Sequence, residues 1–167
     1  MCWTIRWRSL AALLGTALLA GCASGPGFET ENVNRELEPR QAANDGVEQE
    51  TVLWGGTIIS TKPQEATTQI EILAFPLDRG EQPRTNRSSQ GRFLAVADGY
   101  LEPADYDEGR QITVLGTLTE SRTARIGEAD YRYPVVEVRD MHLWPREPTT
   151  YRQEPRVNFG IGVGIMR

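Results

Sequence analysis

Between residues 51 and 145, apolar side chains recur at every second position in short runs that turn-forming residues interrupt. The run 111–119 shows this most cleanly, because Ile112, Val114, Gly116 and Leu118 fall on one side and mainly threonines fall on the other. Side chains alternate between the two faces of a β-strand, so such a run predicts a strand with one buried face. No long 3.6-residue period occurs in this region, which excludes a helical bundle.

The spacing of these runs predicts the architecture. The runs with strand character are 51–60, 67–75, 91–97, 111–119 and 131–143. Five strands in a domain of this size predict an all-β fold, a small five-stranded OB-like barrel whose closure removes exposed strand edges. Gly55 and Gly56 suit a strongly bent first strand that both halves of the barrel share. A two-sheet sandwich is the alternative, although five strands are few for one.

The first 22 residues read as a targeting segment. Arg6 and Arg8 precede an uncharged apolar stretch, 10–20, which is too short for an ordinary transmembrane helix. The stretch ends in Leu19-Ala20-Gly21-Cys22, which resembles the lipobox of bacterial lipoproteins. The resemblance implies that Cys22 is acylated, that residues 1–21 are removed, and that Ala23, not being Asp, favours transport to the outer membrane. An ordinary signal peptide or an N-terminal anchor is the alternative.

Processing at Cys22 has consequences for charge and for thiol chemistry. The mature chain has 16 basic and 23 acidic residues, a net charge of −7. Cys2 leaves with the signal peptide and Cys22 is lipidated, so we expect no disulfide, thiolate metal site or catalytic thiol. The lipobox resemblance implies a diacylglycerol on the thiol and an acyl chain on the amine, and these three acyl chains exceed the two-signal requirement for stable anchoring. We predict no cofactor and no metal.

The predicted barrel, 51–145, is flanked by segments of different composition. Residues 22–50 hold seven acidic and two basic residues, and we expect a largely disordered acidic tether with one short helix, 39–43, ended by Asn44-Asp45-Gly46. Residues 146–167 read as a proline-containing linker followed by an end, 159–166, in which apolar residues alternate with glycine. That end is either a loose tail or a strand that pairs with a partner.

Several segments of the chain form an ordered set of motifs: 52–59, 70–78 followed by Pro83 and 91–93, 98–103 with Asp105, Tyr106 and Gly109, 112–116, 126–128 followed by Tyr131 and 133–136, and 142–144. These segments resemble the Slp family of starvation-inducible outer-membrane lipoproteins. Taken singly these motifs are weak, but their order after a lipobox covers about two thirds of the chain. The resemblance implies an outer-membrane lipoprotein with a small β domain, and a role in envelope maintenance under stress or starvation. It brings no catalytic residues.

Candidate catalytic groups are few. His142 is the only histidine, and zinc or a Ser-His-Asp triad would need further partners. We interpret it as a strand-end residue beside Trp144. Asp105, Asp107 and Glu108 form an acidic cluster that could serve a hydrolase if two carboxylates were held at a suitable separation. A solvated turn is the simpler interpretation, and we predict that the protein is not an enzyme.

Aromatic residues supply the candidate binding surface. Trp54, Tyr100, Tyr133 and Trp144 could line a barrel groove for a ligand or a partner, although core packing is the simpler role for such rings. The mature charge argues against nucleic acid, because phosphate neutralisation dominates that affinity. We therefore expect a structural or partner-docking lipoprotein, held by Cys22 with its domain in the periplasm and an envelope protein as partner. A periplasmic module that binds a peptide, glycan or small molecule is the alternative.

Overall fold

The structure, a computed structural model, describes residues 25–146 of the 167-residue chain. The predictions made for the signal segment 1–21, for Cys22 and for the end 147–167 lie outside the described residues. Within residues 25–146 no helix is long and apolar enough to cross a membrane.

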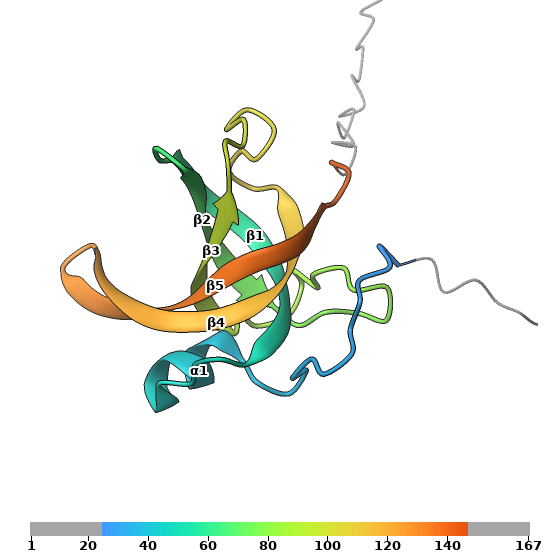
Figure 1. Ribbon diagram of the computed structural model, residues 1–167, viewed down its shortest axis with the longest axis horizontal. Helices are drawn as coiled ribbons and strands as arrows, with labels where there is room; N and C mark the ends of the chain where they lie inside the picture. The colour runs from blue at the N-terminus through green and yellow to red at the C-terminus, as the bar shows by residue number, and fades with distance from the viewer. Residues whose placement is uncertain (1–24, 147–167) are drawn as a thin grey trace, which may run out of the picture.

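Five strands and one short helix make up the described fold (Figure 1). The elements are α1 (Pro39–Asp45), β1 (Thr51–Pro63), β2 (Thr67–Phe75), β3 (Gly91–Asp98), β4 (Gln111–Ile126) and β5 (Ala129–Leu143). All five predicted strands are confirmed. Four of them are longer than predicted. β1 continues to Pro63 and β3 to Asp98. β4 continues to Ile126 and β5 starts at Ala129, so together they form a long hairpin.

The strands close into a barrel in the order β1-β2-β3-β5-β4. Neighbouring strands are antiparallel except β3 and β5, which pair in parallel over the short stretch of Leu94 to Val96. The first strand pairs with β4 through its first half and with β2 through its second half. This sharing of β1 is what the OB-like prediction required, and the sandwich alternative is not observed.

Glycines permit the bend in β1. A side chain on Gly56 would collide with the backbone of Leu73 on β2, and one on Gly55 would meet Leu77 and Thr113. Only glycine lets the strands approach so closely at this point. Gly116 on β4 has the same role against Glu137 of β5, at a position where the register shifts.

The barrel interior holds a continuous apolar core. Its largest members alternate along the strands, as predicted, and include Ile70 and Ile72 of β2, Phe93 of β3, and Leu118 of β4, all fully buried. The inward-facing positions expected for β4 are also confirmed. The outer face differs from expectation, however, because Leu115 and Thr113 point away from the core and are nevertheless buried.

The segment before β1 covers that outer face. Phe28 packs on Leu53 and Leu115, with Val33 and Leu77 at the edge of the same cluster. Asn34 forms a parallel bridge with β1, donating its backbone N–H to Thr51 O at 2.8 Å. The prediction of a largely disordered tether is therefore wrong for residues 28–47. The count of acidic residues hid a few well-spaced apolar side chains that have a surface to bury against.

The predicted helix is confirmed and closes one end of the barrel (Figure 1). It begins at Pro39, whose fixed φ suits a first helical turn, and ends two residues later than predicted, where Gly46 adopts a left-handed conformation. Ala42 faces the barrel and joins its core. Arg40 donates its backbone N–H to Gln90 O at 3.1 Å, which ties the helix to the start of β3.

Candidate functional site

Trp54 belongs to the barrel core. Its side chain is 6% exposed, and its ring meets Phe93 edge to face at a centroid distance of 5.3 Å. The indole N–H donates to Leu37 O at 2.7 Å. Trp54 therefore fastens the N-terminal segment to the barrel, which is a structural role that sequence reasoning did not assign to it.

Tyr133 is likewise buried, with 3% of its side chain exposed, on the outside of the barrel. Its hydroxyl donates to Glu71 Oε1 at 2.9 Å, and Arg92 Nη1 donates to the same oxygen at 2.8 Å. Burial, together with the hydrogen bond to Glu71, raises the pKa of Tyr133 to about 12. The hydrogen bond to Glu71 also raises the pKa of Arg92. The three side chains come from β5, β2 and β3. Their hydrogen bonds therefore hold together the three strands at the parallel β3–β5 pair.

The β4–β5 hairpin occupies the outer face of β2 and β3. Tyr131 packs edge to face on Tyr133 and accepts the backbone N–H of Arg92 at 2.8 Å. Arg122, on the other arm of the hairpin, donates to Gln69 Oε1 at 3.2 Å. In OB folds the face of strands 2 and 3 is where oligonucleotides and oligosaccharides bind. Here side chains of the hairpin contact that face at Gln69, Glu71 and Arg92.

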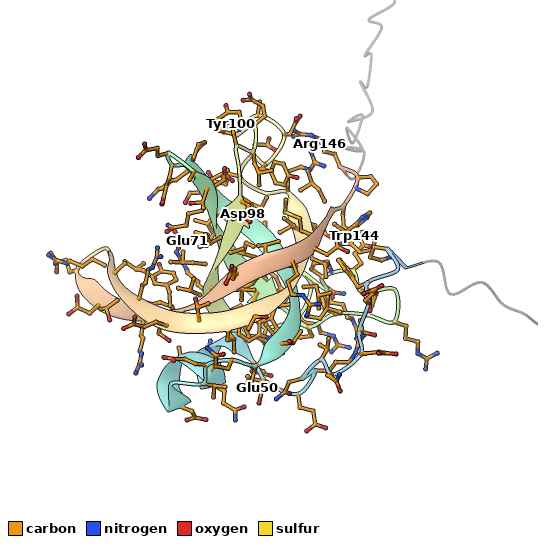
Figure 2. The ribbon with its side chains drawn as sticks, viewed as in Figure 1. Glu50, Glu71, Asp98, Tyr100, Trp144 and Arg146 are labelled. Atoms are coloured by element: carbon orange, nitrogen blue, oxygen red, sulfur yellow. The ribbon has the colours of Figure 1, made fainter. Side chains whose placement is uncertain are left out.

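Tyr100 and Trp144 lie nearer the surface, apart from each other (Figure 2). Tyr100 is 66% exposed, and its hydroxyl donates to Glu102 Oε2 at 3.1 Å, which raises the pKa of Tyr100. Trp144 is half-buried, donates its indole N–H to Thr113 Oγ1 at 2.9 Å, and meets the ring of His142 at 4.6 Å. The four predicted aromatic residues therefore do not line a common groove, because two are buried and two lie at separate places.

The acidic cluster lies in the loop between β3 and β4. Asp107 forms an ion pair with Arg146 at 2.9 Å, and this hydrogen bond lowers the pKa of Asp107. Asp105 and Glu108 are exposed. Among residues 25–146 no group of three or more His, Cys, Asp or Glu side chains could hold a metal ion. The loop is a solvated, ion-paired turn in the described structure.

A groove that the sequence did not reveal lies between the N-terminal segment and the chain leaving β2. It has a volume of about 320 Å³, with Leu37, Leu53, Trp54 and Leu77 among its apolar lining. An ion pair between Arg35 and Glu81 at 2.9 Å bridges the two segments beside it. The signal that could have found it is the placement of Phe28, Val33 and Leu37 in an otherwise acidic stretch.

Comparisons with known proteins agree on one family. The model of the outer membrane lipoprotein Slp family matches residues 19–161. A protein of Haemophilus influenzae, described as uncharacterized, is 35% identical over 139 residues, which are 80% of this chain and 73% of that protein. The Escherichia coli outer membrane protein Slp is 28% identical over 135 residues, 76% of this chain and 69% of that protein. The E. coli uncharacterized lipoprotein YeaY is 33% identical over 91 residues, 54% of this chain and 47% of that protein.

Solved structures show more distant likeness. A small single-stranded DNA-binding protein from Streptomyces coelicolor has a TM-score of 0.36 at 9% identity, covering 58% of this chain and 95% of that one. A mitochondrial single-stranded DNA binding protein from S. cerevisiae has a TM-score of 0.36 at 13% identity, covering 57% and 95%.

The strand order and the shared first strand define a small β-barrel domain of the OB type. The chain belongs to the outer membrane lipoprotein Slp family, since the family model spans most of its length. Membership places the protein at the outer membrane as a lipoprotein.

Proposed function

We propose that the protein is anchored in the outer membrane through acylated Cys22 and that its barrel docks a protein partner of the cell envelope without catalysing a reaction. The observation that carries the proposal is the reach of the family match, which starts at residue 19 and so includes the lipobox residues with the barrel. That one family match covers both Cys22 and the barrel supports the proposal. A lipid anchor of this kind holds a domain at the bilayer surface, where docking is favoured by high local concentration.

The placement of the candidate catalytic groups supports a docking role. Asp107 is committed to an ion pair with Arg146, and His142 packs on Trp144. Trp54 and Tyr133 hold the fold together through their hydrogen bonds to Leu37 and Glu71. Each of these four side chains therefore has a structural partner within the fold. The described residues provide no comparable arrangement around Asp105 and Glu108 that would support a hydrolase.

Nucleic acid is not the partner that we propose. The mature net charge of −7 opposes binding to phosphate backbones. The β2–β3 face also carries the Glu71–Arg92–Tyr133 network and the hairpin in place of open stacking rings.

Metabolic labelling tests the anchor. Radiolabelled palmitate is expected to enter the wild-type protein and not Cys22→Ser. Cys2→Ser is the matched control, since Cys2 lies in the segment that processing removes, and it should label like the wild type. Label in Cys22→Ser, or none in the wild type, contradicts the anchor.

Site-specific photo-crosslinking in intact cells tests the docking role. A photoreactive residue is placed at the exposed position of Tyr100, or at Glu36 on the groove rim. Glu128, exposed in the β4–β5 turn, serves as the control position. A discrete protein adduct at Tyr100 or Glu36 that requires Cys22 supports docking. Adducts that are equal at all positions, or unchanged in Cys22→Ser, contradict it.

The groove favours a second candidate function, the binding of a peptide, glycan or small molecule. Its volume of about 320 Å³ falls at the lower end of the range for ligand sites. Trp54 is one of its lining residues, and Trp144→Phe leaves Trp54 as the sole tryptophan of the mature chain. A saturable change in Trp54 fluorescence on adding envelope glycans or peptides supports this candidate, and an unchanged spectrum across such ligands counts against it.

A further inference from the structure

The described fold begins very close to the proposed lipid anchor. Gly25 lies against the loop between β2 and β3, where a side chain on Gly25 would come within 3.3 Å of Gly80 O and 3.9 Å of Glu81 Oε2. Phe28, three residues later, is buried on the barrel. Cys22 precedes Gly25 by three residues, and three residues of extended chain span about 11 Å at most. The anchor point is therefore confined to the neighbourhood of this loop.

The same loop presents arginines to solvent. Arg79, Arg84 and Arg87 are exposed, and none of them forms an ion pair with another residue of the range 25–146. In contrast, both acidic residues of the loop are engaged: Asp78 accepts the backbone N–H groups of Gly80 and Gln82, and Glu81 pairs with Arg35. The loop thus offers unpaired guanidinium groups, which match the geometry of phosphate.

The loop is held in shape by its own backbone. Leu77 and Pro83 form an isolated bridge, and Arg84 N–H donates to Pro76 O at 2.8 Å. Arg87 N–H in turn donates to Arg84 O at 3.0 Å. An ordered loop presents its side chains at lower entropic cost than a mobile loop would.

We propose that the β2–β3 loop is the surface on which the barrel rests against the membrane, with Arg79, Arg84 and Arg87 contacting the phosphates of lipid headgroups. This inference rests on the proposed acylation of Cys22, which holds the loop at the bilayer surface. Glu29 and Glu31 are exposed on the neighbouring N-terminal segment, so the surface is mixed in charge. The arginines therefore recognise lipid phosphates through bidentate hydrogen bonds at short range and not through long-range attraction.

The opposite side of the barrel then faces away from the bilayer. In Figure 1 the start of the described chain and the β2–β3 loop lie on one side, and the turn of the β4–β5 hairpin lies on the other. The hairpin turn at Gly127 is expected to point into the periplasm.

Fluorescence quenching by labelled lipid tests this orientation. The acylated full-length product is reconstituted into protein-free vesicles of phosphatidylethanolamine and phosphatidylglycerol that contain a lipid with a nitroxide headgroup. With Cys22 acylated, an introduced cysteine is the only free thiol of the mature chain. A fluorophore on Ser88→Cys in the loop should be quenched several-fold more than one on Glu128→Cys in the hairpin turn. Equal quenching, or stronger quenching at Glu128→Cys, overturns the inference.

A charge variant tests the part played by the arginines. Arg79→Gln, Arg84→Gln and Arg87→Gln combined should reduce quenching at Ser88→Cys toward the level at Glu128→Cys. The matched control combines three exposed arginines of the hairpin, Arg122→Gln, Arg125→Gln and Arg132→Gln, and should change nothing at Ser88→Cys. Unchanged quenching in the loop variant, with an unchanged melting temperature, overturns the phosphate contact.

The outcome also separates this inference from the proposed anchor. Mass spectrometry of the purified protein reports acylation directly. A chain without acyl mass overturns the anchor and the inference together. An acylated chain with no difference between the two labelled positions overturns the inference alone.

Discussion

At the scale of single residues, two aromatic side chains of this protein contribute hydrogen bonds to other segments as well as buried apolar area. The Trp54 indole N–H reaches Leu37 O at 2.7 Å, and the Tyr133 hydroxyl reaches Glu71 at 2.9 Å. Both rings bury a large apolar area while their polar atoms satisfy groups on another segment. Residues that composition suggests for ligand binding are thereby committed to holding elements together.

The raised pKa of Tyr133 predicts a loss of stability in alkali. Because the fold favours the neutral phenol, this stabilisation is complete below pH 10, the ordinary pKa, and is lost as the pH rises to about 12. Urea denaturation across this range should show a falling free energy of unfolding for the wild type and a shallower fall for Tyr133→Phe. Glu71→Gln, which removes the neighbouring charge, should also reduce the slope. An identical slope in Tyr133→Phe would show that other groups cause the loss.

At the scale of elements, the N-terminal segment before β1 is part of the domain. It contributes Phe28 to the cluster on the outer face and Leu37 to the core cluster, and it supplies the acceptor for Trp54. The helix α1 continues the same path across the end of the barrel.

Truncation of these apolar side chains should therefore destabilise the whole domain. Leu37→Ala is expected to lower the free energy of unfolding by about 2–5 kcal/mol and Phe28→Ala by about 3–5 kcal/mol, from lost burial and the cavity left behind. Glu31→Ala, an exposed neighbour, should change it by less than about 0.5 kcal/mol. Chemical denaturation measures all three. Values near zero for Phe28→Ala and Leu37→Ala would mean that the segment contributes nothing to stability in solution.

Comparison with the sequence shows which signals are local. Alternation of apolar and polar residues is a local pattern, and it located all five strands and the inward face of β4. The burial of Leu115 on the outer face depends on Phe28, which is far away in the chain, so no window around Leu115 could indicate it. For the same reason the groove beside Leu77 was missed, and no local pattern indicated the hydrogen bond between Trp54 and Leu37. Beyond the barrel, β4 and β5 pair with each other, and this pairing extends both strands past their predicted bounds.

At the scale of the whole molecule, the barrel is complete within the described residues. Its closing pairs join β1 to β4 and β3 to β5, and all of them lie between Thr51 and Leu143. The family match and the barrel architecture therefore describe the same compact unit. The proposed anchor lies on the N-terminal side of this unit.

Removal of residues 157–167 is expected to leave this unit intact. Because strand closure is achieved without that segment, the melting temperature of the shortened protein should stay close to that of the full chain. A scanning calorimetry trace provides the measurement. A drop of many degrees would show that the alternating glycine segment pairs with the barrel.

The packed N-terminal segment also determines how the molecule responds to mechanical load. A pull between a membrane-held Cys22 and a partner bound to the barrel would act first on Phe28, then on the Asn34 bridge, and only afterwards on Leu37 and Trp54. Under tension the segment would detach in that order before β1 is stressed. Loss of the segment would release up to about 28 residues of slack, so the attachment would lengthen in stages while the five-stranded barrel stays folded.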